Sequence, residues 1–61
     1  MGITLKRLRE ARGWSREELA RRAKLSRMYV WKLEAKRADP TVGVVRRLAR
    51  ALRVPVGRLL E

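Results

Sequence analysis

The sequence predicts an all-α fold, in which residues 1–61 form a single compact domain of five helices. Apolar residues recur at the three- and four-residue spacing of helices, and no segment alternates as a half-buried strand would. Gly13, Pro40 and Pro55 interrupt this pattern at intervals that suit short helices. A chain of this length buries only about 60% of the surface that it exposes when unfolded, so we expect one modest core.

The first helix is expected to begin at Thr4, whose hydroxyl would cap it. Leu5, Leu8 and Ala11 then recur on one face of this helix. Gly13 follows at a position where a left-handed helix terminus favours glycine, so we expect the helix to end there.

The second helix has the clearest start signal in the chain. Ser15 and Glu18 have the spacing of a capping box, in which each side chain bonds the other residue's backbone amide. Trp14 and Leu19 occupy the two positions of a hydrophobic staple around it. The next apolar residues are small, which lets another helix approach closely; they are Ala20 and Ala23.

The third helix is expected over residues 27–35, after a short turn. Ser26 would cap it, and Leu25 and Val30 are placed as a second staple. Two short helices that meet across about three residues have the geometry of a helix-turn-helix, whose second helix can enter a groove of DNA.

Pro40 disfavours helix at the residue before it and so predicts a loop. Thr41 would then cap a fourth helix, which carries the longest apolar stripe in the chain. The members of this stripe are Val42, Val45, Leu48, Ala49 and Leu52. Beyond Pro55 we expect a last short helix over Val56–Leu60, with Leu59 and Leu60 facing inward.

Basic side chains dominate the composition. The 17 Lys and Arg residues outnumber 6 Asp and Glu residues, which gives a net charge of +11. A positive field of this strength reaches about 8 Å into physiological solution and predicts a polyanionic partner. Most of the basic residues are Arg, whose guanidinium forks onto a phosphate or a guanine edge, so nucleic acid is the leading class of ligand.

Other classes of protein lack the residues that they need. Cys and His are absent, which excludes disulfides, zinc fingers and imidazole chemistry. Since the sequence has no nucleophile–base pair, metal constellation or phosphate loop, we expect no enzyme, no cofactor, no metal site and no small-molecule ligand. No apolar run is long enough to span a bilayer and no signal peptide begins the chain, so we expect a cytoplasmic protein without a membrane partner.

A helical projection of residues 27–35 separates two faces. Val30 and Leu33 lie on the face that a core requires, and Tyr29 falls near the border. The opposite face carries Arg27, Met28, Trp31, Lys32 and Ala35. A Trp and a Met left exposed beside two bases need a partner, so this face is the candidate recognition surface.

Four residues of this face are the candidate base readers. Arg27 can donate to both acceptors of a guanine, Lys32 can donate to one or both, and Met28 can press on a thymine methyl. For Trp31 two alternatives stay open. Its ring contacts a base or sugar, or it lies over Lys or Arg side chains or against another protein chain.

Candidate phosphate contacts surround the third helix. The hydroxyl of Ser26 and the first amides of the helix suit an anion, because a helix N-terminus is positive; capping alone is the alternative for Ser26. The other candidates are Arg16 at the start of the second helix, Tyr29, and the loop residues Lys36 and Arg37. A solvated basic surface is the alternative for the Arg and Lys residues of this set.

The order of residues resembles the phage Cro and repressor type of helix-turn-helix domain. The matching segments are Leu5-x-x-Leu8-Arg9, Gly13-Trp14-Ser15-Arg16-Glu17-Glu18-Leu19-Ala20, Leu25-Ser26-Arg27, Val30-x-x-Leu33-Glu34, Pro40-Thr41 and Leu48-Ala49-x-Ala51-Leu52. They cover nearly the whole chain in order. The resemblance implies a lambda-repressor-like fold of five helices with operator DNA as its ligand.

By position, the resemblance assigns base reading to Arg27, Met28 and Lys32. It assigns phosphate contact to Arg16, Ser26 and the loop of Lys36 and Arg37. It also suggests that Arg9 on the first helix pairs with Glu34 at the end of the third, which would make Glu34 structural.

The chain departs from the family pattern in three places. Lys24 and Lys36 stand where the family usually has glycine, and a left-handed Lys costs roughly 1 kcal/mol. Either added phosphate attraction compensates for this cost, or the local backbone differs. Arg16 and Arg27 stand where family members often have Gln, so we expect a half-site that contains guanine.

The leading prediction is a transcriptional regulator that binds specific double-stranded DNA as a homodimer, with two recognition helices about 34 Å apart on a palindrome. The simplest dimer contacts are apolar residues near the end of the chain, for which core closure is the alternative. These residues are Val54, Val56, Leu59 and Leu60.

Two other functions remain open. The same fold can be a protein-interaction module of the antitoxin or anti-repressor type, or it can bind nucleic acid without sequence preference. Salt dependence separates the first alternative from DNA binding, because six to ten phosphate contacts lose about 10³ to 10⁵ in affinity between 50 and 200 mM salt.

Overall fold

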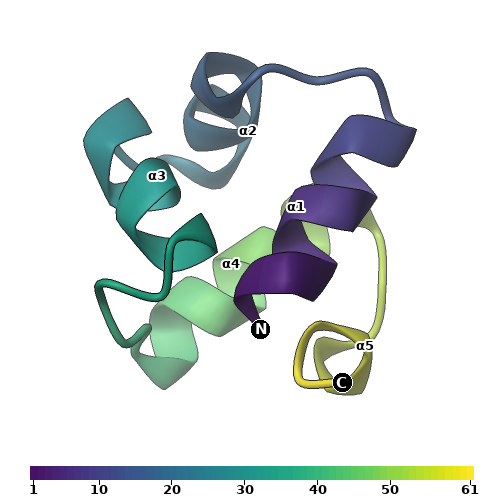
Figure 1. The fold of residues 1–61 in the computed structure, drawn as a ribbon. Coiled ribbons are helices and arrows are strands. Elements are labelled where there is room, and N and C mark those ends of the chain that lie inside the picture. The colour runs from purple at the N-terminus through teal and green to yellow at the C-terminus, as the bar shows by residue number, and fades with distance from the viewer.

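The computed structural model describes residues 1–61 and contains five helices and no strand (Figure 1). The helices are α1 (Gly2–Ala11), α2 (Arg16–Ala23), α3 (Arg27–Glu34), α4 (Val42–Leu52) and α5 (Val56–Leu59). The predicted all-α fold of five helices is therefore confirmed. None of the helices has the length and apolar content needed to cross a bilayer.

All five helices share one core. In Figure 1, α2 and α3 lie side by side, α4 runs beneath them, and α1 lies between α3 and α5, in agreement with the packing of α2 on α3 and α4 and of α1 on α3 and α5. Each helix contributes at least one buried apolar side chain to a single cluster, so even the four-residue α5 is anchored. The cluster consists of Leu5, Leu19, Ala20, Ala23, Val30, Leu33, Val44, Val45, Leu48, Ala49, Leu52 and Leu59.

Three helices begin as their sequences predict. The side-chain oxygens of Ser15, Ser26 and Thr41 accept hydrogen bonds from the backbone amides three residues on, at 3.0, 3.0 and 3.1 Å. Each bond satisfies one of the amides that a helix start leaves without a partner. The predicted starts of α2, α3 and α4 are confirmed.

Only half of the predicted capping box forms. The carboxylate of Glu18 accepts hydrogen bonds from Arg21 and Arg22 in the next turn and does not reach back to the amide of Ser15. The charged guanidinium groups are stronger donors than a neutral amide and so hold the carboxylate. Hydrogen bonds from Arg21 and then Arg22 lower the pKa of Glu18 below its ordinary value.

The predicted start of the first helix was wrong. Helix α1 begins at Gly2, and Met1 is its N-cap without a side-chain hydrogen bond. Thr4 lies inside the first turn, where its hydroxyl donates to the carbonyl of Glu61 at 3.1 Å. The first turn of α1 packs closely on the end of α3, since a Cβ added at Gly2 would lie 2.8 Å from the carbonyl oxygen of Glu34.

Three residues of the predicted apolar faces are exposed to solvent: Ala11, Val42 and Leu60. Ala11 is turned away because the core face of α1 follows Leu5 and Arg9. Val42 lies in the first turn of α4, at the edge of a core face that includes Val44 instead. Leu60 lies beyond the last residue of α5, Leu59, which is the residue of this helix that the core buries.

Three basic residues adopt the left-handed conformation: Lys24, Lys36 and Arg53, with φ of 58°, 59° and 57°. The backbone thus keeps the left-handed geometry at both lysines that stand in place of glycine. Arg53 was not predicted to do so. Lys24 and Arg53 cap the C-termini of α2 and α4, where attraction to the negative helix end offsets part of the conformational cost.

We predict that Lys24→Gly raises the melting temperature. Glycine adopts positive φ without a Cβ penalty, so the free energy of unfolding should increase by about 1 kcal/mol, or ~4–8 °C in a domain of this size. Lys6→Gly, at an exposed helical position of α1, is the matched control and should lower the melting temperature by a similar amount. A fall for Lys24→Gly in thermal unfolding would contradict the cost assigned to the left-handed lysine.

Candidate nucleic-acid interface

Helix α3 is fixed by one face and free on the other. Val30 and Leu33 are buried in the core cluster. On the other side, Met28 is 60% exposed and Trp31 39%, and Arg27 is also exposed. The helix therefore has the two faces that the helical projection predicted, and its outer face is open to a partner.

The start of α2 lies beside this outer face. Arg16, the first residue of α2, lines a shallow hollow of about 310 Å³ together with Arg27, Met28 and Trp31 of α3. Lys32 is exposed on the same helix but does not line the hollow. The hollow thus brings together two guanidinium groups and two large apolar side chains. The sequence had placed these candidate contacts on two separate helices, and the fold puts them side by side.

Arg27 has an acidic neighbour that the sequence did not indicate. Its Nη1 lies 3.0 Å from Oε1 of Glu17 in the first turn of α2, and both side chains are largely exposed. Such a surface pair contributes at most about 1 kcal/mol, so Arg27 can exchange Glu17 for another acceptor at small cost. No local spacing relates Glu17 to Arg27, which is why sequence reasoning missed the pair.

A buried ion-pair network lies behind the hollow. Arg9 donates from Nε to Oε2 of Glu34 at 2.6 Å and from Nη2 to Oε1 at 3.2 Å. Its Nη1 donates to the carbonyl of Trp14 at 2.7 Å. The Glu34 side chain is only 3% exposed, so the forked contact with Arg9 occurs away from water and joins the end of α3 to α1.

Arg16 is the third member of this network. Its Nε donates to Oε1 of Glu34 at 3.0 Å, and 40% of its side chain remains exposed. Glu34 therefore holds Arg16 beside α3 and leaves part of the guanidinium open to solvent. The sequence placed Arg16 near the interface but gave no signal of this link, because the two residues are 18 positions apart.

The remaining candidates lie at the two ends of α3. Ser26 accepts from the amide of Tyr29 at 3.0 Å, which leaves its hydroxyl hydrogen free to donate, and Tyr29 is half-buried against the core. Lys36 and Arg37 are exposed after α3. The Arg37 guanidinium lies 5.6 Å from the centroid of the Trp31 ring, so one alternative for Trp31, a ring that packs against an Arg side chain, occurs in the structure.

Electrostatics favour an anion along this surface. Every carboxylate between residues 16 and 37 is paired with an arginine. Lys32, Lys36 and Arg37 have no carboxylate partner. Because the acidic groups are neutralised and these three basic groups are not, the outer face of α3 and its flanks carry net positive charge.

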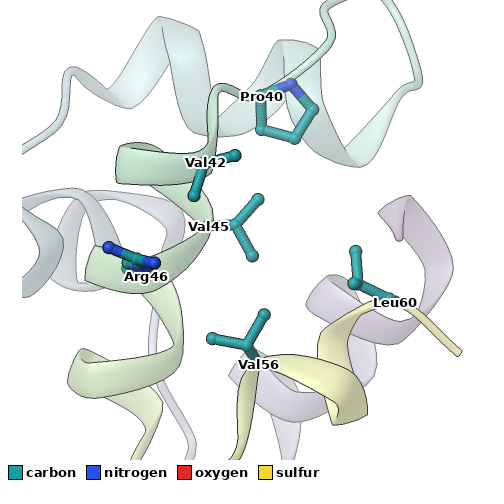
Figure 2. A pocket seen from close by; sticks show the side chains of 6 residues that line it. All are labelled: Pro40, Val42, Val45, Arg46, Val56 and Leu60. Atoms are coloured by element: carbon teal, nitrogen blue, oxygen red, sulfur yellow. The ribbon is translucent and has the colours of Figure 1, made fainter.

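A second hollow, of about 440 Å³, lies between α4 and α5 and is mainly apolar. Figure 2 shows Val45 of α4 opposite Val56 and Leu60, with side chains that point toward one another across the groove. We call it the α4–α5 apolar groove. Its remaining lining residues are Pro40, Val42 and Arg46.

The four residues predicted for dimer contact divide between core and surface. Leu59 is fully buried and Val54 packs against the core cluster, so core closure explains both. Val56 and Leu60 are exposed and line the α4–α5 apolar groove. Only this second pair is available to another molecule.

The chain is similar to known helix-turn-helix proteins over its whole length. The model of a helix-turn-helix domain family matches residues 1–61. The chain is 36% identical over 61 residues to the HTH-type transcriptional regulator SutR of Escherichia coli (strain K12). It spans about a third of the length of that protein, or 34%.

Two solved structures have the same arrangement of helices. The restriction-modification controller protein C.AhdI from Aeromonas hydrophila superimposes with a TM-score of 0.93 and 34% identity, over 95% of this chain and 88% of that one. The hypothetical transcription factor NHTF from Neisseria gives a TM-score of 0.94 and 37% identity, over 98% of this chain and 69% of the other. The predicted resemblance is confirmed.

We predict strong energetic coupling between Arg9 and Glu34. In a double-mutant cycle of Arg9→Met and Glu34→Gln, each single change should destabilise the fold by about 3 kcal/mol, because it removes the forked partner of a buried charge. Arg9→Met leaves Glu34 with Arg16 alone, and Glu34→Gln leaves Arg9 with the Trp14 carbonyl as its remaining charge-independent acceptor. The double variant should be less destabilised than the sum, with a coupling energy of about 1–3 kcal/mol measured by chemical denaturation. Effects that add within about 0.5 kcal/mol would contradict a coupled pair.

Proposed function

Because the chain belongs to the helix-turn-helix domain family, we propose that residues 1–61 form one DNA-binding domain of a transcriptional regulator that recognises a specific double-stranded sequence. The observation that carries this proposal is the outer face of α3, anchored from behind and open in front beside Arg16. The similarity to SutR, a transcriptional regulator, and to C.AhdI, a controller protein, supports it, and neither name is that of an enzyme.

In this proposal α3 lies in the major groove. Arg27 leaves Glu17 and donates to N7 and O6 of a guanine, and Lys32 donates to a base further along the groove. Met28 packs on a thymine methyl. Trp31, held by Arg37, contacts the adjacent sugar and base edge.

The flanking residues fix the register by contacts with phosphates. Arg16 reaches one strand from the start of α2, in the position that Glu34 gives it. Ser26 donates its free hydroxyl hydrogen at the positive end of α3, and Tyr29 reaches the same strand. Lys36 and Arg37 contact the backbone beyond the other end of the helix.

The proposed assembly is a homodimer with two-fold symmetry. Val56 and Leu60 of one copy pack on the α4–α5 apolar groove of the other, and the symmetry makes the contact reciprocal. This contact removes from water three exposed apolar side chains, those of Val42, Val56 and Leu60. The two copies of α3 then lie about 34 Å apart on a palindromic operator.

Selection of bound duplexes from a random pool tests sequence recognition. We predict enrichment of a half-site that contains guanine. Arg27→Ala should lower affinity for the selected site by roughly tenfold to a hundredfold, or about 1–3 kcal/mol, and remove the guanine preference at one position.

Arg7→Ala is the matched control for Arg27→Ala, since Arg7 is exposed on α1 and lies outside the interface. It should lower affinity slightly and leave the enriched sequence unchanged. An unenriched pool with the unmodified chain would remove the proposal of sequence-specific recognition.

Sedimentation of groove variants tests the dimer. We predict that Leu60→Asp shifts the protein toward monomer, because a charge would replace an apolar contact between two copies. Ile3→Asp, at an apolar side chain that is 57% exposed on α1, is the control and should leave the association state unchanged. If both variants and the unmodified chain associate to the same extent, the dimer contact lies elsewhere.

A further inference from the structure

A third hollow, between the C-terminal ends of α2 and α4, concentrates basic residues that the proposed interface does not use. It has a volume of about 410 Å³, and five of its lining residues are basic. We propose that this α2–α4 basic groove binds the phosphodiester backbone of a second DNA duplex while α3 occupies the first. The groove is lined by Arg22, Ala23, Lys24, Arg47, Arg50, Ala51 and Arg53.

Charge is the first argument for an anion in this groove. No carboxylate lines it, and four of its five basic residues take part in no ion pair: Lys24, Arg47, Arg50 and Arg53. Only Arg22 is neutralised, by Glu18 at 2.6 Å, and its guanidinium lies 4.3 Å from the centroid of the Trp14 ring. A concave wall of unpaired cations focuses the positive potential, and a bound anion relieves their mutual repulsion.

The shape of the cationic row favours an extended polyanion. Arg47, Arg50 and Arg53 follow one another at three-residue intervals along α4 and its C-cap. At about 1.5 Å per residue the row spans ~9 Å, the length of roughly two to three nucleotides at ~3.4 Å per nucleotide of one strand. A single small phosphate would meet one end of this row, whereas a DNA backbone can follow all of it. Guanidinium groups also match phosphate oxygens in a forked geometry.

Backbone conformation is an independent argument. Lys24 and Arg53 line the same groove, and both hold a left-handed conformation that glycine adopts at lower cost. Attraction to the negative helix ends explains a cation at either cap. It also covers Arg50, in the last turn of α4, but not Arg47 in the middle of that helix. The Nη1 atom of Arg47 donates to the Lys24 carbonyl at 3.4 Å and joins the row to α2.

The groove is separate from the candidate interface. The hollow on α3 and the α2–α4 basic groove share no lining residue. Arg16 and Lys24 mark opposite ends of α2, about 12 Å apart along the helix axis. Two duplexes can therefore contact one molecule at different places, which would let the protein bridge DNA segments.

The test uses a double variant that keeps the fold. Lys24→Gly with Arg53→Gly removes two groove charges at positions that favour glycine, so its melting temperature should not fall. Lys6→Ala with Arg7→Ala removes the same charge from exposed positions of α1 outside the groove. Each protein is saturated with a fluorescent duplex from the selection experiment, and a 20-base-pair random duplex with a second fluorophore is added at 50 mM salt. Energy transfer between the fluorophores reports a complex with both duplexes.

We expect the unmodified chain to join the two duplexes, and the glycine variant to bind the second duplex about tenfold more weakly. The salt slope for the second duplex should fall by about 2, because two phosphate contacts are lost. The α1 variant should lose no more than threefold. Affinity for the first duplex should change similarly in both variants, since both lose the same long-range charge.

Three results would overturn the inference. The first is the absence of any complex that contains both duplexes, and the second is an equal loss of affinity for the second duplex in both variants. The third is displacement of the second duplex by micromolar tripolyphosphate, which would indicate a site for a small anion. Failure of sequence recognition is distinguishable, because it appears as an unenriched pool. The comparison of variants can then be made with random duplexes in both colours.

Discussion

The buried carboxylate of Glu34 is the constraint on which the structure depends. It receives Arg9 from α1 and Arg16 from α2, and it lies at the end of α3, so one group links three helices. Removing these charges from water is costly, and the forked contact with the additional bond from Arg9 to the Trp14 carbonyl offsets that cost. The same carboxylate places Arg16 beside α3 and thus connects the stability of the fold with the geometry of the interface.

The distribution of charge follows from how few acidic residues the chain has. A net charge of +11 lies on 61 residues, and the carboxylates of the helix-turn-helix are all held by arginines. Of the 17 basic residues 11 take part in no ion pair, and seven of these lie on the outer face of α3 and its flank or in the α2–α4 basic groove. Basic residues even occupy left-handed positions, where glycine would stabilise a domain with so small a core. Under the proposals above, positive charge at those positions contributes to DNA binding at some cost in stability.

The α4–α5 apolar groove is a second exposed surface, separate from the basic ones. The four residues of α5 anchor it in the core through Leu59 alone. Val56 and Leu60 remain exposed beside Val42 of α4. In the proposed homodimer a second copy of the chain covers this surface, and a two-fold contact of this kind needs no complementary patch elsewhere.

The sequence by itself determined the features whose partners lie within one helical turn. Ser15, Ser26 and Thr41 cap their helices through amides three residues away, and the alternation of buried and exposed residues along α3 follows from helical geometry. The predicted five helices and their resemblance to a known family therefore held. Tertiary structure decided the features whose partners are remote: the bond of Thr4 to Glu61 across 57 positions, and the contacts of Arg16 with Glu34 and of Arg27 with Glu17. Local spacing carries no information about such pairs, because packing of the helices alone brings the two groups within reach.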